Sequence, residues 1–102
     1  MILHSVHLTW APGVTDADVQ DLTKALREMA TKIPELRSYR CGPALGLRPG
    51  ADFVVAALVD DADALAAYLD SDVHLAVYDE RRSRMVAGRT AAQLTVADSA
   101  SL

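Results

Sequence analysis

The chain has 102 residues, of which 51% are hydrophobic and 24% charged, a balance that supports one packed domain and excludes a disordered chain. Its net charge of -4 argues against a nucleic-acid partner, because such partners require a basic face. The single cysteine, Cys41, cannot form an internal disulfide, and no stretch reaches the roughly 18 apolar residues that span a membrane. We therefore expect a soluble, cytoplasmic protein with no membrane partner.

The first third of the chain is predicted to form a strand and then a helix. Residues 2–10 alternate in the strand pattern, with one side formed by Ile2, His4, Val6, Leu8 and Trp10. After a turn, Thr15 is a suitable N-cap for a helix whose apolar side chains recur at helical spacing up to Ile33. Pro34 is expected to end this helix.

Two further strands are predicted in the middle of the chain. Residues 38–47 form a weak strand interrupted by Gly42, Pro43 and Gly46, and the proline predicts an edge strand or a bulged strand. Residues 53–59 are apolar throughout, so both faces of this strand are expected to be buried. Helices cover only one face of such a sheet, and we therefore expect a homodimer that buries the other face.

The last part of the chain is predicted to contain two helices and a strand. Asp60 or Asp61 caps the first helix, which is expected to bury Ala62, Leu65, Ala66 and Leu69. The second helix runs from about Val73 to Met85, with Gly88 as its C-terminal cap. Residues 90–97 form the final strand.

The resulting order is β-α-β-β-α-α-β, which is a ferredoxin-like α+β fold with an antiparallel four-stranded sheet. We expect one domain over residues 1–98 and a flexible tail over residues 99–102.

Tyr68 and His74 are the first candidates for a reactive site. On one continuous helix, six steps of about 100° would leave them roughly 120° apart. Residues 70–72, Asp-Ser-Asp, favour a break at which Ser71 or Asp72 starts a new helix. His74 then lies in a first turn, where the helix dipole disfavours a positive charge, so a neutral imidazole that can act as a base is predicted.

His4 is expected to face the helices and to share a pocket with Tyr68 and His74. His7 points to the opposite face of the same strand, so the two histidines cannot bind one metal ion and no metal site is predicted. Each residue also has a structural interpretation, as a core tyrosine or a buried structural histidine. Residues 79–84, DERRSR, are interpreted as a solvated helix end or, alternatively, as an anion-binding rim.

Several segments in order resemble the stress-responsive dimeric α/β barrel family over nearly the whole chain. These segments are His4 in the first strand, IPEL (33–36), DF (52–53), AAYLDSDVH (66–74) and VAD (96–98). The resemblance implies a homodimeric barrel of two back-to-back sheets. It also implies that Tyr68, His74 and His4 correspond to the reactive tyrosine and histidines of a polyketide cyclase in this family.

The implied activity is a cofactor-independent, aldol-type cyclisation of a poly-β-keto substrate. His74 would remove a proton from an activated methylene, Tyr68 would donate a hydrogen bond to the developing oxyanion, and His4 would polarise another carbonyl. The alternatives are a non-catalytic stress-responsive dimer that binds a hydrophobic or aromatic small molecule, and a cofactor-independent quinol-type monooxygenase. A cavity of several hundred Å³ beside these side chains would favour an enzyme, whereas a filled core would favour the non-catalytic dimer.

Overall fold

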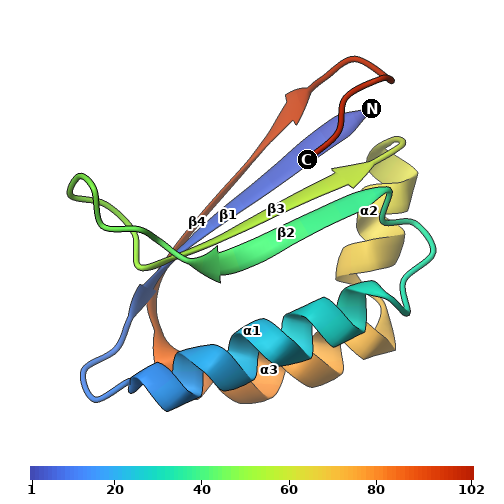
Figure 1. Cartoon of the computed structure of the whole chain (residues 1–102). Helices are drawn as coiled ribbons and strands as arrows, with labels where there is room; N and C mark the ends of the chain where they lie inside the picture. The colour runs from blue at the N-terminus through green and yellow to red at the C-terminus, as the bar shows by residue number, and fades with distance from the viewer.

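The computed structural model describes all 102 residues and consists of one antiparallel sheet and three helices, and the helices lie on one face of the sheet (Figure 1). The strands are β1 (Ile2–Trp10), β2 (Ser38–Pro43), β3 (Phe53–Val59) and β4 (Val86–Thr95), and the helices are α1 (Asp16–Ala30), α2 (Ala62–Leu69) and α3 (Asp72–Met85). The strand order β2-β3-β1-β4 confirms the ferredoxin-like prediction and places β2 at an edge. None of the helices combines the length and hydropathy needed to cross a membrane.

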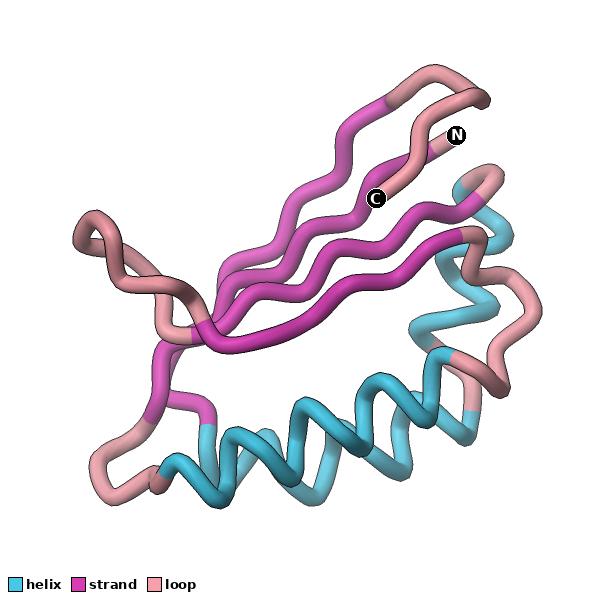
Figure 2. Tube along the Cα trace, in the orientation of Figure 1, coloured by secondary structure: helices cyan, strands magenta, loops and turns pink.

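The two faces of the sheet differ in what covers them. Figure 2 shows the strands as one layer with every helix on the same side. On that side Val6, Leu8 and Phe53 are buried in the core with side chains from α1, where Thr15 forms the predicted N-cap. The opposite face, which we call the outer face, carries the following side chains: Leu3, Ser5, His7, Val54, Ala56, Ala92 and Leu94.

The predicted break between the last two helices is present. Asp61 caps α2, which ends at Leu69, and Ser71 caps α3 by accepting a hydrogen bond from the backbone N–H of His74. Two predicted core positions of α2 are wrong, because Ala62 and Ala66 are exposed. The side of this two-turn helix that faces the sheet buries Tyr68 instead.

The predicted cap at Gly88 is also wrong. The α3 helix ends at Met85 and β4 starts at once at Val86, four residues earlier than predicted. Gly88 lies in the strand and pairs with Thr9, next to an irregularity in the β1–β4 register. The backbone N–H of Ala11 donates a hydrogen bond of 2.7 Å to the carbonyl of Met85, so this carbonyl at the end of α3 is satisfied without a glycine cap.

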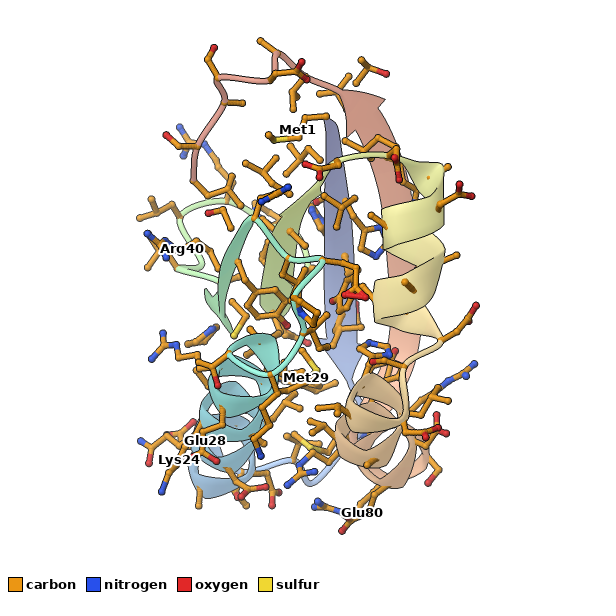
Figure 3. All side chains as sticks on the ribbon, turned by 90° about the vertical axis from the view of Figure 1, so that its right-hand side faces the viewer. Met1, Lys24, Glu28, Met29, Arg40 and Glu80 are labelled. Carbon is orange, nitrogen blue, oxygen red and sulfur yellow. The ribbon has the colours of Figure 1, made fainter.

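Arginines of the DERRSR segment connect α3 to α1 rather than forming a free rim. Arg81 forms an ion pair with Asp21 at 3.0 Å and Arg84 one with Asp18 at 3.3 Å. Figure 3 shows the two helices side by side below the sheet. These contacts join the C-terminal half of α3 to the N-terminal half of α1.

The residues after β4 turn back over the outer face. The Met1 ammonium group forms an ion pair with Asp98 at 3.0 Å, and Arg40 of β2 donates a hydrogen bond of 3.1 Å to the carbonyl of Leu102. The tail therefore crosses from the β4 edge to the β2 edge and covers one end of the outer face.

Candidate functional site

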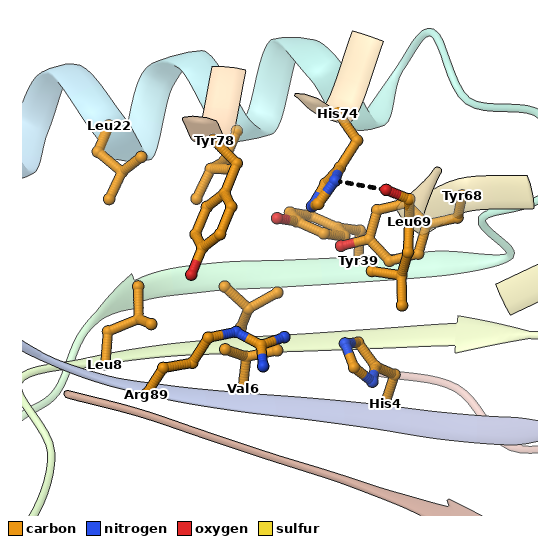
Figure 4. A pocket seen from close by; sticks show the side chains of 12 residues that line it. His4, Val6, Leu8, Leu22, Tyr39, Tyr68, Leu69, His74, Tyr78 and Arg89 are labelled. Atoms are coloured by element: carbon orange, nitrogen blue, oxygen red, sulfur yellow. Dashed lines mark hydrogen bonds between the residues drawn. The ribbon is translucent and has the colours of Figure 1, made fainter. Parts of the chain in front are cut away.

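A small pocket lies between the sheet and the helix layer, where all three predicted site residues meet (Figure 4). Its volume is about 30 Å³. The polar or aromatic side chains that line it come from five elements, and they are His4 of β1, Tyr39 of β2, Tyr68 of α2, His74 and Tyr78 of α3, and Arg89 of β4. Apolar side chains complete the wall: Val6, Leu8, Leu22, Leu26, Val55 and Leu69.

Two of the lining residues, His4 and Tyr39, belong to one row of residues across the four strands. Gln93 pairs with His4, His4 with Ala57, and Ala57 with Tyr39. Residues directly opposite each other in neighbouring strands point to the same face, so all four side chains face the helices. The Tyr68 ring of α2 lies edge to face with both His4 and Tyr39, with ring centroids 6.3 and 6.4 Å away.

The helix break fixes the orientation of the His74 ring. Leu69 is the last residue of α2, and its carbonyl lies 3.0 Å from His74 Nδ1. A carbonyl oxygen only accepts hydrogen bonds, so Nδ1 carries the proton. The lone pair of the imidazole is therefore on Nε2, which is the nitrogen available to act as a base.

Aromatic contacts hold the His74 ring in this position. Tyr68 meets it edge to face with ring centroids 5.1 Å apart, and Tyr78 stacks on it at 5.6 Å with an angle of 19° between the planes. In Figure 4 the hydroxyls of Tyr39 and Tyr68 point toward the space below the imidazole. A base and several hydroxyl groups thus face the same small volume.

His4 presents a donor to the pocket rather than a base. Gln93 Nε2 donates a hydrogen bond of 2.9 Å to His4 Nδ1, so the ring proton is on Nε2. His4 is only 1% exposed, and its Nε2 has no hydrogen-bond partner in the protein. Its ring lies edge to face with Tyr68, with centroids 6.3 Å apart.

Burial keeps both imidazoles neutral and the phenols protonated. Burial lowers the pKa of His4 and His74 below the ordinary value, and the positive charge of Arg89 lowers both further. The direction agrees with the neutral His74 that the sequence predicts, and burial is its largest cause. Burial also raises the pKa of Tyr68 to about 12 and that of Tyr39 above its ordinary value. At neutral pH the pocket holds one base and several protonated donors.

The free energy of unfolding is expected to decrease as the pH falls below about 6.5. The folded-state pKa of His4 and His74 lies below the ordinary 6.5, so the unfolded chain binds more protons in this range and acid favours unfolding. Denaturant titrations between about pH 7.5 and 5.5 measure the slope, at pH values where most carboxylates are already ionised. A His4→Gln variant should show a shallower slope, and an unchanged slope would contradict the assignment.

Four lining or supporting residues were not predicted as part of the site. Tyr78 lies one helical turn after His74, and this i, i+4 spacing is a signal that the sequence does contain. Tyr39, Arg89 and Gln93 reach the pocket only through the strand register, which the sequence does not specify.

Neither a metal site nor a reactive thiol is found. No group of three or more histidine, cysteine or acidic side chains lies close enough together to hold a metal ion. Burial raises the pKa of the Cys41 thiol, which makes it a weak nucleophile at neutral pH.

Comparisons with known proteins give the same fold and a family. The model of the stress-responsive A/B barrel domain family matches residues 2–96. The uncharacterized protein SCO4036 of Streptomyces coelicolor is 37% identical over 79 residues, covering 74% of this chain and 81% of that protein. A dimeric ferredoxin-like protein of unknown function from Thermobifida fusca superimposes with a TM-score of 0.85 at 35% identity, covering 93% of this chain and 90% of the other.

A solved enzyme has the same fold at much lower identity. The hydroxynitrile lyase from Passiflora edulis superimposes with a TM-score of 0.80, covering 96% of this chain and 94% of the other. The two sequences are 11% identical, so this likeness is one of fold.

Proposed function

The chain belongs to the stress-responsive A/B barrel domain family, and we propose that it is a cofactor-independent lyase that breaks or forms a carbon–carbon bond beside a carbonyl group. The observation that carries this proposal is the pairing of one free imidazole nitrogen, His74 Nε2, with protonated donors around a buried pocket. Aldol-type chemistry needs such a set, because a base moves one proton while donors stabilise the oxyanion.

Cleavage of a β-hydroxy ketone follows directly from this arrangement. His74 Nε2 takes the hydroxyl proton, and the O–H electron pair forms a new carbonyl as the carbon–carbon bond breaks. The electrons of that bond move onto the ketone and give an enolate, whose oxyanion accepts a hydrogen bond from Tyr68, with His4 Nε2 as a second donor. His74 then returns the proton to the enolate carbon, so the imidazole ends neutral. The reverse reaction is an aldol addition, and within one poly-β-keto chain it would be a cyclisation.

The cavity is far smaller than the several hundred Å³ that would favour an enzyme, so this observation weighs against the enzymatic proposal, which then requires a short substrate. The cavity volume of 30 Å³ holds about one or two water-sized molecules, roughly a tenth of an ordinary ligand pocket. A folded polyketide or a quinol would fit only if the wall formed by Tyr78 and Arg89 moved outward. A short β-hydroxy ketone requires a smaller movement of the same wall.

The lining argues against the non-catalytic, hydrophobic-ligand alternative. Three polar atoms at the pocket are buried without a partner: His4 Nε2, Tyr39 Oη and Tyr78 Oη. A hydrophobic ligand would leave these atoms without hydrogen bonds, and each unsatisfied atom costs about 1–3 kcal/mol of free energy. A carbonyl or oxyanion would accept hydrogen bonds from them.

The direct test is the cleavage of diacetone alcohol, a small neutral β-hydroxy ketone, to acetone. NMR of the purified protein without added cofactor should show acetone release above the buffer rate, also in the presence of a chelator. Polyketide thioesters and quinols belong in the same panel, watched for cyclised or oxidised products. Absence of turnover on every member of the panel would overturn the proposal.

We also propose that the chain forms a homodimer through the outer face. The Thermobifida fusca protein is dimeric, and Leu94 on the outer face is 60% exposed although it is a large apolar side chain. Leu94→Glu is expected to shift the mass measured by light scattering from dimer to monomer. Leu75→Glu, an exposed leucine of α3 away from this face, should remain dimeric. The same mass for both variants would contradict this interface.

A further inference from the structure

We infer that the substrate of the proposed lyase is a short keto acid whose carboxylate is bound by Arg89 at the rim of the pocket. This inference rests on the proposed function and adds the substrate class to it.

Arg89 stands at the open side of the pocket. It is paired with Leu8 across β1 and β4, so its side chain lies on the helix side of the sheet. Figure 4 shows its guanidinium group between the hydroxyl of Tyr78 and the imidazole of His4. Arg89 is an exposed residue that also lines the pocket, so its charge is accessible to a ligand entering from solvent.

No acidic side chain neutralises this guanidinium. Three other arginines are paired with aspartates, and the pair of Arg37 with Asp60 is bidentate at 2.9 and 2.7 Å. Arg89 takes part in no such pair, and none of the twelve lining residues is acidic. The chain has 14 acidic residues and a net charge of -4, so a cationic pocket without a single carboxylate is selective for an anion.

The polar atoms opposite Arg89 fit the rest of a keto acid. A carboxylate matches the planar guanidinium through two parallel hydrogen bonds. Tyr78 Oη is buried beside that position without a partner, and His4 Nε2 and Tyr39 Oη lie deeper in the pocket without partners. The keto carbon of such an acid is bonded directly to the carboxylate carbon, and its oxygen could accept hydrogen bonds from these groups. This arrangement places the scissile bond near His74.

The test uses two substrates that differ in one group. In 4-hydroxy-4-methyl-2-oxopentanoate a carboxylate replaces the methyl group next to the ketone of diacetone alcohol, and cleavage gives pyruvate and acetone instead of two acetone molecules. For the wild-type protein, kcat/KM for the acid is expected to exceed that for the neutral ketone by about 10- to 100-fold, the range of charge-assisted hydrogen bonds. Arg89→Gln should bring this ratio near one, and Arg89→Lys should retain part of it.

Arg48→Gln is the matched control, because it removes the same charge from an exposed loop away from the pocket. It should keep the wild-type ratio. Circular dichroism and thermal unfolding show whether each variant is folded. A wild-type ratio near one, or a ratio that Arg89→Gln leaves unchanged, would overturn the inference while the lyase activity stands.

A binding measurement separates this inference from the proposed function. NMR titration of the wild-type protein with pyruvate should show saturable chemical-shift changes at the pocket. Pyruvate should bind Arg89→Gln much more weakly, and inorganic phosphate should bind the wild-type protein more weakly than pyruvate does. If neither substrate is cleaved but this pattern holds, the lyase proposal is wrong and the carboxylate site is supported. Equal binding of phosphate and pyruvate would overturn the assignment of a keto acid.

Discussion

Replacing His74 with alanine is expected to lower kcat/KM for β-hydroxy ketone cleavage by about 10²- to 10⁴-fold. His74 Nε2 is the free nitrogen of the only neutral imidazole oriented as a base in the pocket, because the His4 ring presents its proton there instead. Steady-state rates from NMR or a coupled acetone assay measure the effect.

Two controls separate loss of the base from loss of structure. His74→Asn keeps an amide that can donate to the Leu69 carbonyl but has no basic nitrogen, so it should be as inactive as His74→Ala while staying folded. Leu75→Ala changes the next residue of α3, which is exposed, and should stay within about twofold of wild type. If His74→Asn retained wild-type activity, another group would have to be the base.

The sequence predicted the parts of the fold that depend on local chemistry. The alternation of β1 placed His4 on the helix side and His7 on the other, because side chains of a strand alternate with period two. The Asp-Ser-Asp segment predicted the break, because these residues compete with helical hydrogen bonds and cap well. Together these local rules brought Tyr68 and His74 to the same pocket.

What the sequence did not predict depends on register and packing. Gln93 and Tyr39 share a row with His4 only because β4 and β2 pair in particular registers, and a shift of one residue would turn them to the outer face. The early start of β4 brought Arg89 to the pocket by the same means. The cavity volume depends on how the side chains of all seven elements fill the interior. No pattern in the sequence specifies this packing.

Tyr68→Ala is expected to destabilise the protein by about 3–5 kcal/mol, a large part of the roughly 5–15 kcal/mol that stabilise a domain. Tyr68 is 2% exposed, and its ring contacts those of three neighbours, His4, Tyr39 and His74, with centroids between 5.1 and 6.4 Å away. Removal of the ring leaves a cavity between the sheet and the helix break. Urea unfolding monitored by circular dichroism measures the loss.

Tyr68→Phe keeps the ring and removes only the hydroxyl, so it separates packing from chemistry. Its stability should stay within about 1 kcal/mol of wild type, since the ring and its aromatic contacts remain. Its kcat/KM should still fall by about 10²-fold, because a pre-placed donor to the oxyanion is lost at the step where negative charge develops. A stable Tyr68→Phe variant with full activity would assign this tyrosine to the core alone and leave Tyr39 or His4 as the donor.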